Sequence, residues 1–118
     1  MIFVFVEDGT VEVLDRPEAA LQYEPLDVES GVFVFYDEDG TWLRPRFTRP
    51  NRRRFFGVLL EQGSFEVERS DALDPAVDPF DVALAEAQAL KPNKYFATLD
   101  AIRQHLASMR ASRTGPTS

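Results

Sequence analysis

The sequence predicts an α+β fold: a mostly antiparallel sheet of five or six strands built from hairpins, with two C-terminal helices packed on one face and a short helix between the first two hairpins. Two Asp-Gly pairs each separate runs of alternating apolar residues, and Gln62-Gly63 separates two more. After Asp78, apolar residues recur at helical spacing. The length of 118 residues fits one domain with its own core. We expect a single domain over residues 1–110 and a flexible tail over 111–118.

The first hairpin is predicted over residues 2–14, with Asp8-Gly9 as its turn. A two-residue type I′ turn would place Val6 opposite Val11. Directly opposed residues share a face, so the aliphatic residues would gather on one side of the hairpin and point to the core. These are Ile2, Val4, Val6, Val11 and Val13.

A short helix is expected to begin with Asp15 as its N-cap and to end before Pro25. The second hairpin follows over residues 32–47, with Asp39-Gly40 as its turn. The same two-residue turn would pair Tyr36 with Leu43, although a one-residue change in loop length would exchange the two faces. Pro45 places its strand at a sheet edge or at a bulge. The second face would then carry aromatic and charged residues at a partly wet surface: Phe33, Phe35, Asp37, Trp42, Arg44 and Arg46.

A third hairpin is predicted from strands over 55–61 and 64–69, which would share an apolar face of Phe56, Val58, Leu60, Phe65 and Val67. A helix is expected to open at Asp78-Pro79 and to end at Pro92. The last helix is expected from about Lys94 to Arg110, because its apolar residues recur every three or four positions. They are Leu99, Ile102, Leu106 and Met109.

Charge is distributed unevenly along the chain. The net charge is −7, yet residues 1–43 hold 11 acids and one base, whereas residues 44–54 hold six arginines and no acid. A negative total disfavours nucleic acid as the main ligand, because phosphate binding is largely electrostatic. It favours a cationic partner, or serves solubility alone.

Several kinds of functional site are excluded by composition. The chain has no cysteine and one histidine, so thiolate chemistry and His-pair metal motifs are absent. The six glycines form neither a dinucleotide fingerprint nor a phosphate loop. His105 has no nucleophile in a recognisable motif, and we interpret it as a structural residue. We therefore expect no enzymatic activity, no cofactor and no metal. No apolar run approaches a membrane span, which predicts a soluble, cytoplasmic protein.

Over residues 44–56 the six arginines are interleaved with the aromatic residues Phe47, Phe55 and Phe56, as in some nucleic-acid-binding surfaces. Three other roles compete with that one. Arg44 and Arg46 could pair with acids elsewhere in the sheet, residues 52–54 could form a solvated loop, and the whole run could protect a strand edge from aggregation.

Residues 27–41, Asp-Val-Glu-Ser-Gly-Val-Phe-Val-Phe-Tyr-Asp-Glu-Asp-Gly-Thr, follow a helix with Glu18-Ala-Ala. This pattern, over about residues 15–47, resembles small bacterial immunity proteins of polymorphic or contact-dependent toxin systems. The resemblance implies a non-enzymatic protein that binds a cognate toxin domain, often a nuclease with a basic cleft.

On that resemblance, an acidic surface would steer association with the toxin and aromatic residues and arginines would anchor it. The steering acids would be Glu7, Glu12, Asp37, Glu38 and Asp39; the anchors would be Phe33, Phe35, Tyr36, Trp42, Arg44 and Arg46. This hypothesis requires the acids to lie on one outer patch without neutralising partners. The alternatives are a self-associating module that uses the aromatic face and the Pro45 strand edge, and a nucleic-acid-binding domain that uses Arg44–Arg54.

Overall fold

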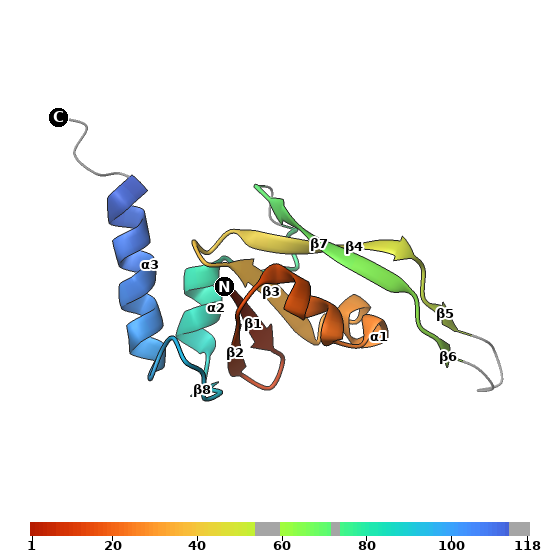
Figure 1. The fold of residues 1–118 in the computed structure, drawn as a ribbon, viewed down its shortest axis with the longest axis horizontal. Helices are drawn as coiled ribbons and strands as arrows, with labels where there is room; N and C mark the ends of the chain where they lie inside the picture. The colour runs from red at the N-terminus through yellow and green to blue at the C-terminus, as the bar shows by residue number, and fades with distance from the viewer. Residues whose placement is uncertain (54–59, 72–73, 114–118) are drawn as a thin grey trace.

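A computed structural model describes residues 1–53, 60–71 and 74–113 (Figure 1). It confirms the α+β fold with a six-stranded, mostly antiparallel sheet. The strand order is β7-β4-β3-β1-β2-β8, and only β2 and β8 pair in parallel within it. The strands are β1 (Ile2–Val6), β2 (Thr10–Leu14), β3 (Phe33–Asp37), β4 (Trp42–Arg49), β7 (Ser64–Ser70) and β8 (Ala89–Leu90).

Helices cover both faces of this sheet. The two predicted C-terminal helices, α2 (Phe80–Glu86) and α3 (Leu99–Arg113), pack on one face. The short helices η1 (Pro17–Gln22) and α1 (Pro25–Glu29) pack on the other. Two clusters of buried side chains result. The α2–α3 cluster contains Phe3, Val11, Tyr36, Trp42, Phe80, Leu84, Ile102 and Leu106. The η1–α1 cluster contains Ile2, Val4, Ala20, Val28, Phe35, Leu43 and Phe65.

The predicted strand registers of the first two hairpins are wrong by one residue. Phe5 lies opposite Val11, and Tyr36 lies opposite Trp42. Both turns contain three residues rather than two, ending in a glycine with φ of +92° at Gly9 and +85° at Gly40. This is the three-residue hairpin loop in which the last residue adopts the left-handed conformation.

The shift redistributes the side chains between the two faces. Ile2 and Val4 now face η1 and α1, whereas Val11 faces α2 and α3, so the predicted aliphatic face does not exist. Trp42 likewise lies on the opposite side of the sheet from Phe35. The predicted aromatic surface that joins these two residues is therefore wrong. Both faces of β1 are apolar because helices cover both sides of the sheet.

The third hairpin is also wrong in its pairing. Strand β7 pairs with β4 along Trp42–Phe47, and beyond it β5 (Arg52–Arg53) pairs with β6 (Leu60–Glu61). The predicted strand over 55–61 falls mostly on residues 54–59, outside the described part of the chain. Arg52 and Arg53 therefore extend a ribbon instead of forming a loop. This ribbon, residues 42–53 with 60–70, projects away from the other strands (Figure 1).

Pro45 accounts for the point where the ribbon separates from β3. The β3–β4 pairing ends at Leu43, which lies opposite Phe35. If the pairing continued in the same register, Pro45 would lie opposite Phe33. Proline has no N–H to donate, so the ladder cannot continue on that side. At Pro45, β4 therefore has no strand partner on the side of β3, as expected of a sheet edge. On its other side β4 pairs with β7, so Pro45 does not lie in an edge strand.

The helices differ from expectation at their ends. Pro25 ends the first helical segment, as expected, but it also begins α1. The second helix ends at Glu86, and β8 occupies the residues before Pro92. The Asn93 side chain accepts hydrogen bonds from the main-chain N–H groups of Tyr95 and Phe96, which holds this segment in a turn. The Thr98 hydroxyl oxygen accepts the N–H of Ala101 at 3.1 Å as an N-cap, and the last helix begins at Leu99 and continues to Arg113. Residues 114–118 of the predicted tail lie outside the described chain.

Within the described residues, no helix combines the length and the apolar character that crossing a membrane requires.

Candidate functional site

The acidic residues predicted from sequence do not form one patch. Glu7 follows β1, whereas Asp37, Glu38 and Asp39 lie at the end of β3. Because β1 and β3 are antiparallel, with Val6 opposite Phe33 and Ile2 opposite Asp37, the two groups lie at opposite ends of the strands. Four residues of strand separate those ends by roughly 13 Å.

The acids at the β3–β4 turn are neutralised by Arg69 on β7. Its guanidinium pairs with the Asp37 carboxylate and, at 2.9 Å from Nη2 to Oδ2, with Asp39. Burial alone would raise the pKa of Asp39, but hydrogen bonds from Arg69 and Thr41 more than offset it and lower that pKa to about 2. Glu38 is exposed, and its carbonyl oxygen accepts a hydrogen bond from Nε2 of His105 at 2.9 Å. His105 also contacts the rings of Phe3 and Phe96, as expected of a structural histidine.

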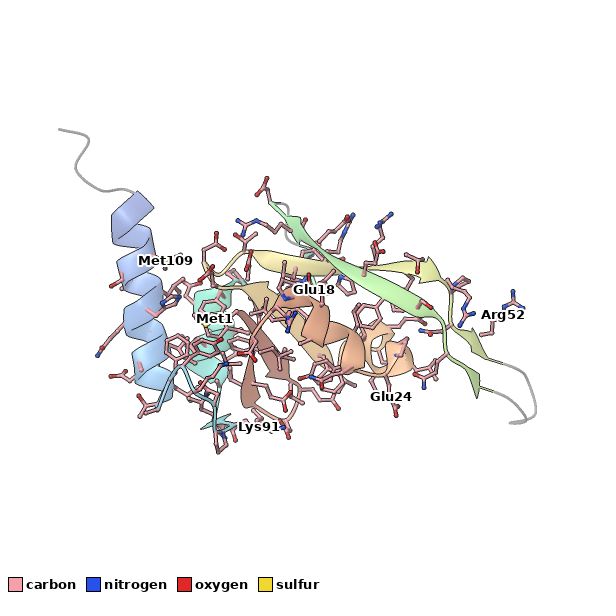
Figure 2. The ribbon with its side chains drawn as sticks, in the orientation of Figure 1. Met1, Glu18, Glu24, Arg52, Lys91 and Met109 are labelled. Carbon is pink, nitrogen blue, oxygen red and sulfur yellow. The ribbon has the colours of Figure 1, made fainter. Side chains whose placement is uncertain are left out.

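Glu12 lies on the η1 side of the sheet and is also paired. One carboxylate oxygen is 2.9 Å from Nζ of Lys91, and the other accepts a hydrogen bond from the hydroxyl of Tyr23. Burial, followed by this hydrogen bond, raises the pKa of the Tyr23 hydroxyl. The side chain of Glu12 is only 16% exposed. Lys91 lies beside β8 (Figure 2).

The predicted anchors are also engaged within the fold. Arg44 pairs with Glu68, and Arg46 lies 2.9 Å from Glu66, so these arginines form the internal ion pairs considered among the alternatives. Tyr36, Phe35 and Trp42 are buried, and the half-buried ring of Phe33 lies 4.4 Å from the ring of Tyr23. Among the predicted acids, only Glu7 and Glu38 are exposed and have no described cation as an ion-pair partner.

A different acidic surface surrounds Glu7. A hollow of about 420 Å³ lies between the β1–β2 turn, residues 76–78 and the C-terminal half of α2. We call it the acidic hollow. Its walls combine polar groups with apolar side chains, among them those of Phe5, Val34, Val77 and Ala83. Four carboxylates line it as well: Glu7, Asp8, Asp78 and Glu86.

Tertiary contacts bring these carboxylates together. The carbonyl oxygen of Gly9 accepts a hydrogen bond from the N–H of Gln88 at 2.8 Å, which places the end of α2 beside the β1–β2 turn. The Tyr36 hydroxyl donates to the carbonyl oxygen of Asp78 at 2.6 Å, which fixes the segment before α2. The pKa of the Tyr36 hydroxyl is raised, mainly because the side chain is buried.

The electrostatics of the acidic hollow differ from those of the β3–β4 turn. All four of its carboxylate side chains are exposed, and none forms an ion pair with a described cation. The Asp8 carboxylate accepts the N–H of Thr10 at 2.9 Å, which lowers the pKa of Asp8. A concave surface of one charge sign concentrates the field, so this hollow attracts cations.

Of these four carboxylates, only Glu7 is predicted from sequence as a binding residue: Asp8 is interpreted as part of a turn, and Asp78 and Glu86 lie about 70 or more positions further along the chain. Hydrophobic patterning predicts which helix or strand a residue belongs to, but it does not predict which helices and strands lie next to one another. No group of three or more metal-ligating side chains is positioned to share an ion within residues 1–53, 60–71 and 74–113.

Comparison of the chain with protein-family models, curated proteins and solved structures finds no match.

Proposed function

We propose that the chain is a non-enzymatic binding protein that neutralises a basic partner protein. In keeping with the resemblance at residues 15–47, the partner is a cognate bacterial toxin domain and the binding occurs in the cytoplasm. The observation that carries this proposal is the acidic hollow. It combines four carboxylates that lack described cationic partners with several apolar side chains in one hollow.

Each part of the hollow has a role in this proposal. The carboxylates, in a chain of net charge −7, steer a basic surface into contact and accelerate association. The apolar side chains of the hollow contact the aliphatic part of a lysine or arginine side chain while its charged end meets the carboxylates. The proposed surface therefore keeps Glu7 and replaces the ion-paired residues Asp37 and Asp39 with Asp78 and Glu86.

The nucleic-acid alternative has less support. Arg44 and Arg46 are paired with glutamates of β7, which cancels much of their attraction for phosphate. Arg52 extends near the outer end of the ribbon, far from Lys91 (Figure 2).

Copurification with the product of the adjacent gene tests the proposal. Glu7→Lys combined with Glu86→Lys should weaken the complex by about tenfold or more, because both charges lie at the hollow. The matched control, Glu24→Lys with Glu29→Lys, changes the net charge equally at exposed positions outside the hollow and should change affinity by less than about threefold. Absence of a complex, or equal weakening by both pairs, would contradict the proposal.

A further inference from the structure

The outer edge of the described sheet is a strand of seven residues that pairs with another strand on one side only, while η1 packs beside it. Strand β7 pairs with β4 and with no other described strand. The opposite edge of the sheet is β8, which has only two residues. A long open edge presents unpaired main-chain groups to which another extended chain can bond.

The register with β4 identifies which groups of β7 point outward. Pro45 lies opposite Val67 and has no N–H, so these two residues cannot form a hydrogen-bonded pair. The N–H and carbonyl groups of Val67 therefore point away from β4. Alternation along the strand gives the same direction to Phe65 and Arg69.

The two sides of this edge differ in chemistry. On the α2–α3 side of the sheet, Glu66 and Glu68 face Arg46 and Arg44 across β4. The contact of Glu66 with Arg46 uses one of the two Glu66 carboxylate oxygens, and the Glu66 side chain is 61% exposed. Both carboxylate oxygens of Glu68 already face arginines, Oε1 toward Arg44 and Oε2 at 3.6 Å from Nε of Arg46, so Glu66 is the main carboxylate for a further cation. A cation on a further strand would continue the row with alternating charge.

On the η1 side, a hollow of about 270 Å³ adjoins the same edge. Pro17, Glu18, Leu21, Glu66 and Val67 line it. Leu21 is 48% exposed, one of the few large apolar side chains in the described chain with that much exposure. An apolar side chain on an added strand would cover Leu21 and Val67 there.

A second copy of this chain fits the edge poorly. Two β7 strands that overlap along their full length in antiparallel register would place Val67 at the two-fold axis. Glu66 of each copy would then lie opposite Glu68 of the other. Like charges directly opposite one another destabilise a strand pair. The edge therefore favours a different, basic strand over self-association.

We propose that β7 binds an extended segment of a partner protein by strand addition, and that this segment alternates basic with apolar residues. The basic residues lie opposite Glu66 and Glu68, and an apolar residue between them covers Val67 and Leu21. This surface lies away from the acidic hollow, so the proposal does not depend on the one above.

A labelled peptide, Thr-Val-Lys-Val-Lys-Val-Thr, tests this inference with the full chain by fluorescence anisotropy. Antiparallel to β7, its valines lie opposite the outward-pointing residues, so valine N–H groups bond to β7 and lysine N–H groups point to solvent. Methylation of the central valine nitrogen should weaken binding by at least about tenfold, because it removes one of these bonds. Methylation of a lysine main-chain nitrogen should change affinity by less than about threefold.

Protein variants supply a second readout that leaves the peptide unchanged. Glu66→Gln with Glu68→Gln should weaken binding several-fold, whereas Glu24→Gln with Glu29→Gln, which changes charge equally on and beside α1, should not. Glu86→Gln in the acidic hollow should also leave peptide affinity unchanged, which separates this surface from the first proposal. Equal binding of the two methylated peptides would overturn strand addition, as would an unsaturable signal at millimolar concentration or equal binding of a peptide with glutamate in place of lysine.

Discussion

The turn between β1 and β2 and the turn between β3 and β4 have the same local structure in different surroundings. In each, an aspartate side chain accepts the N–H of the threonine two residues later, at 2.9 Å for Asp8 and 3.0 Å for Asp39, and a glycine follows with positive φ. Arg69 neutralises Asp39 at one turn. Asp8, at the other, lines the acidic hollow without a described cation. Local sequence thus determines the geometry of the turn, whereas distant residues determine the charge that it presents.

The largest difference between the turns should appear when their glycines are replaced. Gly40→Ala should lower the free energy of unfolding by about 2–4 kcal/mol. The backbone is left-handed there, and the new Cβ would lie 3.1 Å from the buried Leu106 and 3.3 Å from Cβ of the buried Phe80. Urea denaturation measures this loss.

Gly9→Ala is the matched change at the other turn, and we expect a loss nearer 1 kcal/mol. The three atoms nearest to its new Cβ all belong to the side chain of Gln88, the first at 3.2 Å, and Gln88 is exposed. An equal loss for both variants would mean that the packing of Gly40 against α2 and α3 adds nothing to the strain of the turn.

A smaller difference should appear in acid. The pKa of Asp39 is about 2, below its unfolded value near 3.8. Its ionised form therefore stabilises the fold fully above about pH 5, and this stabilisation is lost as pH falls toward 2. Asp39→Asn should cost about 1 kcal/mol at pH 7, since Arg69 is half exposed, and nothing near pH 2.

Asp8→Asn is the control for this measurement. Asparagine can still accept the threonine N–H at either turn, so the comparison isolates the contribution of Arg69. The urea midpoint of Asp8→Asn at pH 7 should stay closer to that of the original chain than the midpoint of Asp39→Asn does. The reverse order would show that the ion pair with Arg69 is not what distinguishes the turns.

The smallest effect should come from charge reversal at the acidic hollow. Glu7→Lys should change the free energy of unfolding by no more than about 0.5 kcal/mol, because this exposed side chain has no described ion-pair partner. Asp37→Lys should cost about 1 kcal/mol by placing a second cation beside Arg69. Thermal denaturation at low salt compares them, and a marked loss for Glu7→Lys would reveal a stabilising role for its carboxylate.

The two turns also show how far sequence carries a structural prediction here. Asp-Gly placed both hairpins correctly, and the apolar spacing of Ile102 and Leu106 identified the buried side of α3. The face of each strand was predicted wrongly, because a loop of three residues instead of two moves every following side chain to the other side. With helices on both sides of the sheet, both faces of β1 are apolar and no alternation remained to correct the error.

The candidate sites lay further from what sequence could predict. Alternation of Glu66, Val67 and Glu68 indicated a strand but not its partner, and β7 pairs with β4 rather than with residues 55–61. The acids near the N-terminus are numerous, yet Lys91 and Arg69, both distant in sequence, engage three of them. Only Glu7 remained in a candidate site, where it meets Asp78 and Glu86.

The environment of Phe3 has a consequence for the order in which the chain folds. Its ring contacts Phe80, Phe96 and His105, all at least 77 positions later in the sequence. During synthesis from the N-terminus, the first three strands can therefore pair early, but one side of their sheet stays uncovered until the last helix leaves the ribosome. A ribosome stalled before residue 99 should hold a nascent chain that binds a hydrophobic dye and is cleaved readily by protease, and release of the complete chain should abolish both properties.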